Sequence, residues 1–269
     1  MAADDFADRY GPWAVVAGAS DGTGAAFARE AAARGVNVVL VARRADVLAT
    51  VADGISEATG ADTRVVPLDL GVVGAAETLA RETDDLEVGL LVYNAGADPH
   101  GMRFLDVDVD DWAAMLRRNC ETPLRLCHRY APVMVDRGSG GILLVTSGAA
   151  WAGGDRLATY AATKAFDLVL GESLWAELSP RGVDVLSFVL GATDTPAYHA
   201  LVAKHGGKAA EGLADADSVA RDGLDHLADG PTRHTAALGG GDASLVGAMP
   251  RRDAVQIMSA GVSEMVGEQ

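Results

Sequence analysis

Short runs of apolar residues alternate along the chain with longer segments in which apolar positions recur every three or four residues. Runs that are apolar at nearly every position predict strands buried on both faces, as in a parallel sheet covered by helices. The predicted strands are residues 13–17, 37–42, 63–68, 88–93, 141–146 and 183–190, with a weaker run at 233–238. The predicted helices are residues 24–35, 44–59, 72–83, 109–137 with a break at Pro123, 157–179, 215–229 and 251–265. This alternation predicts an α/β fold with a doubly wound, mostly parallel sheet of about seven strands.

The same alternation predicts one domain over residues 1–269. No Pro/Ser-rich linker, internal repeat or low-complexity tract divides the chain, and the composition does not change after residue 190. Residues 193–212 show no clear periodicity and exceed the length of ordinary connections, so we expect an irregular, mobile lid there. A Gly-rich stretch at 239–250 precedes the last predicted helix.

The net charge of the chain makes some classes of binding partner less favourable than others. The chain has 38 Asp and Glu against 22 Lys and Arg, a net charge of −16, and no basic block. Nucleic acid and anionic membranes are therefore disfavoured as partners. The N-terminal sequence lacks the features of a secretion signal and no apolar run could span a bilayer, so we expect a cytoplasmic protein. Cys120 and Cys127 lack metal or redox spacing and are expected to be buried thiols.

A glycine-rich turn follows the first predicted strand and leads into the first predicted helix. Its glycines are Gly18, Gly22 and Gly24, and Ser20, Asp21 and Thr23 lie between them. Glycines allow the backbone to approach a pyrophosphate, whose charge is stabilised by free N–H groups at the start of a helix. The spacing G-x-x-x-G-x-G differs from the commoner G-x-G-x-x-G, but its position between strand and helix favours a phosphate site.

Arg43 and Arg44 follow the second strand, at the position that lies beside the adenosine ribose in this fold class. An acidic residue there would bind the free 2′-hydroxyl of NAD, whereas a basic residue would bind the 2′-phosphate of NADP. Because Ala42 leaves the acidic position empty, the sequence favours NADP(H) over NAD(H). The alternative is that the two arginines only begin a solvated helix.

A phenol and an ammonium lie four residues apart at Tyr160 and Lys164, and hence on one face of a predicted helix. The chain has only three lysines, so this spacing is uncommon by chance. A cation about 4 Å away would lower the pKa of a phenol by about three units, toward the range useful in acid–base catalysis. A helix pair without chemistry is the alternative for this motif taken alone. However, predicted strands also deliver Ser147 and Asn94 to the same edge of the sheet.

This combination of motifs resembles the short-chain dehydrogenase/reductase family, whose members have a Rossmann-like single domain of similar length. The resemblance covers residues 13–240 and is carried by the glycine turn, the Asn94-Ala95-Gly96 segment, Ser147 and the Tyr160/Lys164 pair, in this order. It implies a catalytic set of Asn119, Ser147, Tyr160 and Lys164. It also implies that the cofactor contacts Gly18, Ser20, Asp21, Gly22, Thr23, Gly24, Arg43, Arg44, Asp69, Leu70, Asn94, Ala95, Gly96, Tyr160, Lys164, Gly191, Thr193 and Thr195.

The roles implied by the resemblance agree with the side-chain chemistry. Ser147 would hold the substrate oxygen, and Tyr160 would give or take the proton. Lys164 would lower the pKa of the tyrosine and bind the nicotinamide ribose, while Asn119 would hold a water that relays protons. The hydride belongs to the nicotinamide, so the protein's task is orientation and charge stabilisation.

The chain departs from the family pattern at four positions without losing a reacting group. Ala17 replaces Thr before the glycine turn, Thr23 replaces Ile within it, and Tyr93 replaces the first Asn of the NNAG motif. Leu190 replaces a proline after the sixth strand, which removes a rigid entry to the lid.

An apolar pocket is expected around the reaction centre, formed by Trp151, Leu157, Tyr198 and Leu201. It would suit a ketone or secondary alcohol of moderate size, cyclic or steroid-like. No metal site is expected, because the histidines lack ligand spacing and the acidic string from Asp106 does not fit a calcium loop.

We therefore expect an NADP(H)-dependent carbonyl reductase or alcohol dehydrogenase, similar to the hydroxysteroid dehydrogenases. The alternatives are an NADP-binding sensor without turnover and an epimerase or dehydratase on the same fold. The resemblance also implies a homo-oligomer, a tetramer or dimer, formed through the helices at 121–137 and 157–179.

Overall fold

The computed structural model describes residues 3–235 and 244–266, and in them seven parallel strands form one sheet. The strands are β1 (Trp13–Ala17), β2 (Asn37–Ala42), β3 (Thr63–Pro67), β4 (Val88–Tyr93), β5 (Gly140–Ser147), β6 (Val183–Leu190) and β7 (Thr232–His234). Their order is β3-β2-β1-β4-β5-β6-β7, so the order reverses between β1 and β4. In open sheets of this kind, ligands bind beside such a reversal, at the carboxyl ends of the strands.

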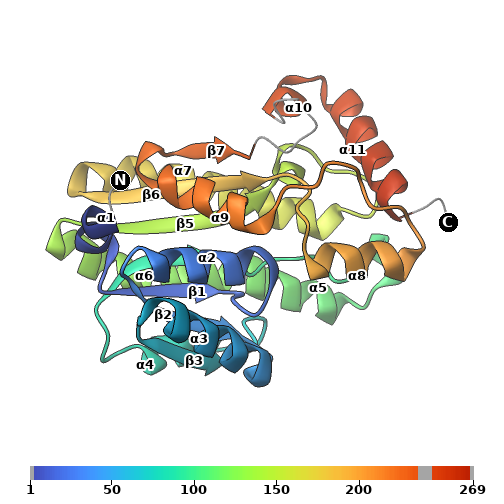
Figure 1. Cartoon of the computed structure of the whole chain (residues 1–269). Helices are drawn as coiled ribbons and strands as arrows, with labels where there is room; N and C mark the ends of the chain where they lie inside the picture. Colours follow the sequence, from blue (N-terminus) through green and yellow to red (C-terminus); the bar gives the residue numbers. More distant parts are fainter. Residues whose placement is uncertain (1–2, 236–243, 267–269) are drawn as a thin grey trace.

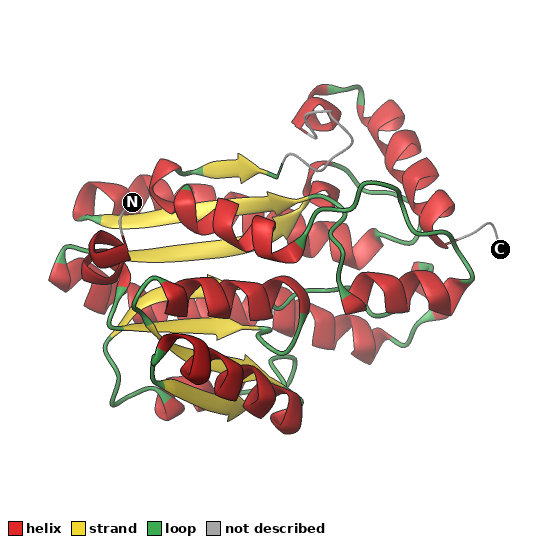
Figure 2. Cartoon of the chain, in the orientation of Figure 1, coloured by secondary structure: helices red, strands yellow, loops and turns green. Residues whose placement is uncertain are grey.

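Helices cover both faces of the sheet (Figures 1 and 2). One face is covered by α1 (Ala3–Tyr10), α2 (Gly22–Ala33), α3 (Ala45–Thr59) and α9 (Ala216–Asp225). The other face is covered by α4 (Ala75–Glu82), α6 (Thr122–Arg137) and α7 (Ala158–Leu178). The remaining helices are α5 (Val109–Leu116), α8 (Pro196–His205), α10 (Ser244–Ala248) and α11 (Arg251–Val266).

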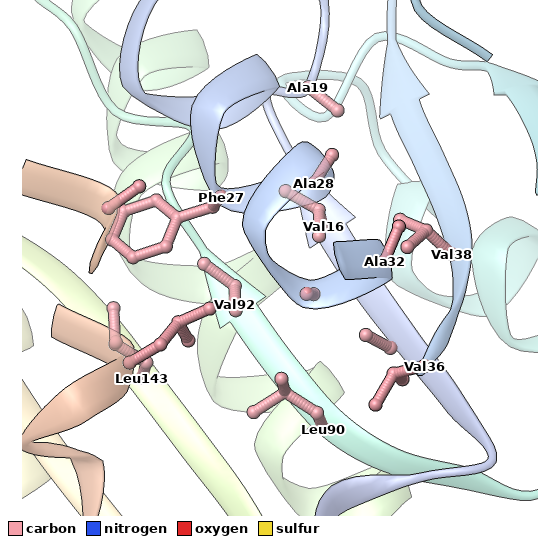
Figure 3. Close-up of a cluster of buried hydrophobic side chains, with 14 of the residues drawn as sticks. Val16, Ala19, Phe27, Ala28, Ala32, Val36, Val38, Leu90, Val92 and Leu143 are labelled. Atoms are coloured by element: carbon pink, nitrogen blue, oxygen red, sulfur yellow. The ribbon is translucent and has the colours of Figure 1, made fainter. Parts of the chain in front are cut away.

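Successive strand residues point to opposite faces, so the sheet supports two hydrophobic cores. Val16 packs under α2 with Phe27 and Val92, as Figure 3 shows, whereas the adjacent Val15 belongs to the core beneath α4 and α6. All three valines and the phenylalanine are inaccessible to solvent. The predicted α/β fold with a doubly wound parallel sheet is confirmed.

Two predicted elements differ from the structure. The segment expected to be irregular contains helix α8, whose first turn is capped by the Thr195 hydroxyl and which ends at Gly206 with a φ of +65°. The long helix at 109–137 is interrupted before Pro123, by a π-helical turn at Arg117–Glu121. Pro123 lies in the first turn of α6, where the missing N–H costs nothing, so it does not cause the break.

Other differences are smaller. Helix α1 was not predicted, and the predicted helices at 72–83 and 215–229 are shorter, at 75–82 and 216–225. Strand β7 occupies the start of the seventh predicted strand, while residues 236–238 of that prediction lie outside the described residues. Of the Gly-rich stretch, residues 244–248 form α10 and residues 239–243 also lie outside them.

The strands end at one edge of the sheet, beside which α8 and α11 lie (Figure 1). Residues from the ends of β1, β4, β5 and β6 therefore reach the same region as two helices from late in the chain. In the described part of the chain, no helix has the length and hydropathy needed to cross a bilayer.

Candidate active site

The glycine turn joins β1 to α2 and is closely packed. Gly18 has a φ of +82°, and its N–H donates to the Val41 carbonyl at 2.8 Å. A Cβ on Gly24 would lie 2.0 Å from the Gly18 carbonyl oxygen, so no side chain fits there. The turn thereby brings backbone to the start of the 12-residue helix α2, whose free N–H groups suit a pyrophosphate. The residues present fit the dinucleotide cofactor predicted from the sequence.

The end of β4 is tied to this turn. The Thr23 hydroxyl donates to Asn94 Oδ1 at 2.8 Å, and a Cβ on Gly18 would touch the backbone of Ala95 at 3.0 Å. Thr195 contacts the turn from the other side, since a Cβ on Gly22 would lie 2.9 Å from its methyl group. The structure thus brings together predicted cofactor residues from β1, β4 and the start of α8.

The two arginines after β2 have different surroundings. Arg44 donates to the Asp21 carboxylate and, at 3.1 Å, to the Ser20 hydroxyl, so it is held against the glycine turn. Arg43 is exposed and its charge adds to the desolvation that lowers the pKa of the mostly buried Arg118. Both arginines therefore lie near the turn.

The remaining residues predicted to contact the cofactor follow β3 and β6. Asp69 caps the turn after β3 by accepting from the Gly71 N–H at 2.8 Å. The Leu70 side chain is buried beneath α4 and α6, and its carbonyl accepts from the Thr122 hydroxyl at 2.9 Å. After β6, the Gly191 N–H donates to Thr235 Oγ1 at 3.0 Å, and the Thr193 hydroxyl donates to the Gly191 carbonyl at 3.1 Å.

Lys164 lies at the centre of the catalytic residues predicted from the sequence. It is 3% exposed, and its Nζ donates to the Val145 carbonyl at 2.8 Å. A Cβ on Gly96 would lie only 2.5 Å from this Nζ, so the ammonium could not keep this position if residue 96 had a side chain. The lysine ammonium is therefore fixed between β5 and the loop that follows β4.

Asn119 reaches the same place from the π-helical turn. It is fully buried, and its Nδ2 donates to Thr163 Oγ1 at 2.9 Å and to the Gly96 carbonyl at 3.4 Å. Arg118 Nε donates to its Oδ1 at 3.1 Å, which fixes the amide from the other side. π-Helical turns interrupt the regular hydrogen-bond ladder and are frequent at functional sites.

Tyr160 and Ser147 lie on elements that pack against each other. Ser147 ends β5, and its hydroxyl accepts from the Ala149 N–H at 3.2 Å at the start of a 3-10 turn. Ala149 packs with Leu157 and Ala161, which flank Tyr160 at the start of α7. The catalytic set predicted from the sequence is thus gathered at the carboxyl ends of β4 and β5.

The residues predicted to line the substrate pocket fall into two groups. Leu157 is buried beside Tyr160, and Trp151 stacks on His234 with ring centroids 5.5 Å apart. On α8, Leu201 contacts Gly101, where a Cβ would lie 2.9 Å away, and the Tyr198 hydroxyl accepts from the Ala210 N–H at 2.9 Å. Helix α8 is therefore attached to the loop after β4.

A further apolar surface beside these residues comes from α11 and was not predicted from the sequence. Met258, Val262 and Met265 pack in one hydrophobic cluster with Leu157 and Tyr160, and the Ser259 hydroxyl accepts from the Asp155 N–H at 2.9 Å. The periodicity of α11 predicted a helix, but nothing in it indicated which part of the fold that helix covers. An apolar surface therefore adjoins the tyrosine.

Sequence reasoning also missed Thr163 and Asp167, both buried on α7 beside the predicted catalytic residues. Both cysteines are free thiols, but only Cys127 is buried as expected, while Cys120 is half-buried. Burial raises the pKa of both to about 12. Among the described residues, no group of His, Cys, Asp and Glu is arranged to hold a metal ion.

Comparison with known proteins agrees with this geometry. The family model for short chain dehydrogenases matches residues 12–206. A 7beta-hydroxysteroid dehydrogenase from Clostridium sardiniense is 36% identical over 194 residues, which are 72% of this chain and 74% of that protein. The solved structure of a 7beta-hydroxysteroid dehydrogenase, studied for its stereoselectivity, has a TM-score of 0.82 and 26% identity, covering 94% of this chain and 98% of that chain.

A short-chain dehydrogenase from Sphingobium yanoikuyae, solved in complex with NADPH, has a TM-score of 0.74 and 28% identity, covering 83% of this chain and 87% of that chain. The match over residues 12–206 includes the glycine turn, the loop after β4, and the residues at the ends of β5 and the start of α7. The chain therefore belongs to the short-chain dehydrogenase/reductase family of NAD(P)-dependent oxidoreductases.

Proposed function

We propose that the protein transfers a hydride between NADP(H) and an apolar ketone or secondary alcohol of steroid-like size. The observation that carries this proposal is the packing of Met258, Val262 and Leu157 in one hydrophobic cluster with Tyr160. An apolar surface beside the proton-transferring phenol favours a substrate whose reacting carbon is part of a hydrophobic skeleton. The similarity to 7beta-hydroxysteroid dehydrogenases supports the same substrate class.

The roles of the protein's own residues follow from their positions. The nicotinamide, when bound, supplies or accepts the hydride. Tyr160 donates its proton to the carbonyl oxygen during reduction and takes it back during oxidation, while Ser147 holds that oxygen by its hydroxyl. Lys164 keeps a positive charge beside the phenol and stabilises the negative charge that develops there. Asn119 keeps the loop at Gly96 in place against the lysine and orders the water through which protons reach it.

The preference for NADP(H) is part of the proposal. Arg43 is exposed at the end of β2 and has the charge needed for a 2′-phosphate. Arg44 is already paired with Asp21, so Arg43 is expected to make the larger contribution. The NADPH complex of the similar Sphingobium yanoikuyae enzyme supports this preference.

A homo-oligomer, a tetramer or dimer, is proposed through α6 and α7. Exposed apolar side chains on these helices support it, namely Leu124 and Val133 on α6 and Val169 on α7. Chromatography combined with light scattering would measure the mass, and a monomer would contradict this part of the proposal. The cytoplasmic location expected from the sequence remains a prediction.

The function is tested by following the absorbance of NADPH during reduction of 7-oxo bile acids and oxidation of ursodeoxycholate, a 7β-hydroxysteroid. Tyr160→Phe should reduce turnover by about 100-fold or more while NADPH still binds. Tyr130→Phe is the matched control, because that phenol pairs with Thr83 beneath α6 and is not part of the site. Equal turnover by wild type and Tyr160→Phe would contradict the proposal.

The same assay separates the alternatives. A sensor would bind NADPH without turnover in a broad panel of ketones and alcohols. An epimerase or dehydratase would convert substrate without a stoichiometric change in the absorbance of reduced cofactor.

A further inference from the structure

A buried carboxylate lies next to the proposed catalytic lysine. Asp167 is 2% exposed, and its Oδ2 accepts from Lys164 Nζ at 3.2 Å, one turn further along α7. Its second oxygen, Oδ1, is buried without a hydrogen-bond partner among the described residues. An ionised carboxylate in such a place costs free energy, so its presence calls for a physical role.

Tyr160, Lys164 and Asp167 occupy positions i, i+4 and i+7 of α7, which lie on one face of the helix. Lys164 therefore lies between Tyr160 and Asp167 along this face of the helix, and its ammonium contacts the carboxylate. Along the helix axis the first and last residues are roughly 10 Å apart. At that separation a buried charge still acts on the phenol.

Lys164 is held from several sides in this arrangement. Its ammonium donates to the Val145 carbonyl and to Asp167, and it lies against the backbone of Gly96. The carboxylate provides charge as well as a hydrogen bond, so it also cancels part of the positive field of the ammonium. Asp167 therefore influences both the position of the Lys164 ammonium and the strength of its positive field.

We propose that Asp167 is a positioning residue for Lys164, which orients the ammonium and sets how much of its positive field reaches Tyr160. The proposal rests on the proposed function, in which Tyr160 and Lys164 work as the acid–base pair. Asp167 lies two turns of α7 from Tyr160, so it acts by holding the ammonium and by offsetting part of its positive field.

Of Asp167 and the neutral groups that face it, only Asp167 is expected to change its charge near neutral pH. Burial raises the pKa of Asp167 to about 6, and the attraction of Lys164 opposes this effect. The groups that face it from the neighbouring elements are the Tyr93 phenol of β4, the Cys120 thiol of the π-helical turn and the Cys127 thiol of α6. Burial raises the pKa of all three, so they remain neutral around pH 6 to 8.

The first experiment observes Lys164 directly, without turnover. The chain has three lysines, so the side-chain ¹³Cε and ¹⁵Nζ signals of the labelled full-length protein can be assigned with a Lys204→Arg and a Lys208→Arg variant. In the wild type, the Lys164 signal should shift with an inflection near pH 6, when Asp167 titrates. In Asp167→Asn that inflection should be absent, while the signals of the two exposed lysines remain unchanged.

The second experiment measures the pH dependence of oxidation with ursodeoxycholate and NADP⁺ as the probe pair. Asp167→Asn keeps an oxygen acceptor but removes the negative charge, so more of the ammonium's field reaches the phenol. The pH at which kcat is half-maximal should therefore fall by about one unit. Glu172→Gln is the matched control, because that carboxylate also lies on α7 but pairs with Thr232, and its profile should not move.

The outcomes separate this proposal from the proposed function. If wild type does not oxidise the probe, the substrate class is wrong, and the lysine signals still decide the role of Asp167. A Lys164 signal without an inflection between pH 5 and 8 in the wild type would overturn the proposal, even if Asp167→Asn does not fold. An unchanged pH profile in a folded, active Asp167→Asn would overturn it as well.

Discussion

The Asn119 amide donates a 2.9 Å hydrogen bond to the Thr163 hydroxyl, which joins the π-helical turn to helix α7. The Thr163 hydroxyl in turn donates to the Tyr160 carbonyl at 2.8 Å, so the amide is linked to the backbone of the proposed proton donor. Both side chains are inaccessible to solvent, and neither could find water if the bond were lost. The relative position of the π-helical turn and the Tyr160 turn thus depends on this bond.

Thr163→Val should reduce kcat about tenfold and the free energy of unfolding by about 1–3 kcal/mol, because it leaves the Asn119 amide with an unpaired buried N–H. NADPH affinity should change little. Thr83→Val is the matched control, since this buried threonine pairs with Tyr130 away from the site. The free energy of unfolding of Thr83→Val should fall by a similar amount, while its kcat should be unchanged. A similar fall of kcat in both variants would contradict a specific role for Thr163.

Arg43→Ala should weaken NADPH binding about tenfold or more and NADH binding less than about threefold, because only NADPH has the 2′-phosphate. Fluorescence titration of the purified protein measures both constants without any substrate. Equal losses for the two cofactors would overturn the assignment of Arg43.

Asp21→Asn should strengthen NADPH binding about threefold, because it releases Arg44 from an ion pair that lies at the protein surface. The same titration applies, with NADH as the internal comparison. Unchanged NADPH affinity would mean that Arg44 does not reach the cofactor even when it is released.

Met258→Asp should raise KM for a steroid substrate about tenfold, because it introduces a charge into the apolar surface beside Tyr160. Ile257→Asp is the matched control, since that neighbouring side chain on α11 is 48% exposed. Its KM should remain that of the wild type. The proposed substrate surface is wrong if both variants leave KM unchanged.

The pKa of Asp167 also predicts how stability depends on pH. The folded-state pKa of about 6 is above the unfolded value near 4, so the folded state binds more protons between these values. The contribution of this carboxyl to the free energy of unfolding therefore falls as pH rises from about 4 through 6 and is constant above that.

Between pH 5 and 8 the free energy of unfolding of the wild type should fall by about 1 kcal/mol relative to that of Asp167→Asn, because the asparagine does not titrate. Urea unfolding of both proteins at the two pH values gives this difference, and other titrating groups cancel in the comparison. Glu172→Gln should show no such trend. If the free energy of unfolding of the wild type does not fall relative to Asp167→Asn over this range, the pKa of the carboxyl is not raised in the folded state.

Much of the fold was predictable because buried parallel strands are apolar on both faces and short in sequence. The glycine turn could be located from local signals, since Gly18 and Gly24 are needed where backbone approaches backbone. Helix α8 was missed because its residues Pro196–His205 form no continuous apolar stripe, and only Val202 among them is buried. Its capping residue Thr195 and the Gly206 that ends it were the available local signals.

Other features depend on contacts between distant parts of the chain and could not be predicted from local patterns. The π-helical turn has no proline or glycine to mark it, since its sequence is Arg-Arg-Asn-Cys-Glu. Asp167 was overlooked because a charged helix residue is normally solvated. Its burial follows from the packing of α7 against the sheet and α6.

Helix α11 follows the segment that the family model matches, yet its side chains Met258 and Val262 belong to one hydrophobic cluster with Tyr160 of that segment. On the proposed function, acid–base chemistry and substrate choice would depend on different stretches of the chain. Exchanging the C-terminal helix between homologues in a chimaera is then expected to change the substrate preference, while the hydrogen bonds from Asn119 to Thr163 and from Lys164 to Val145 stay intact.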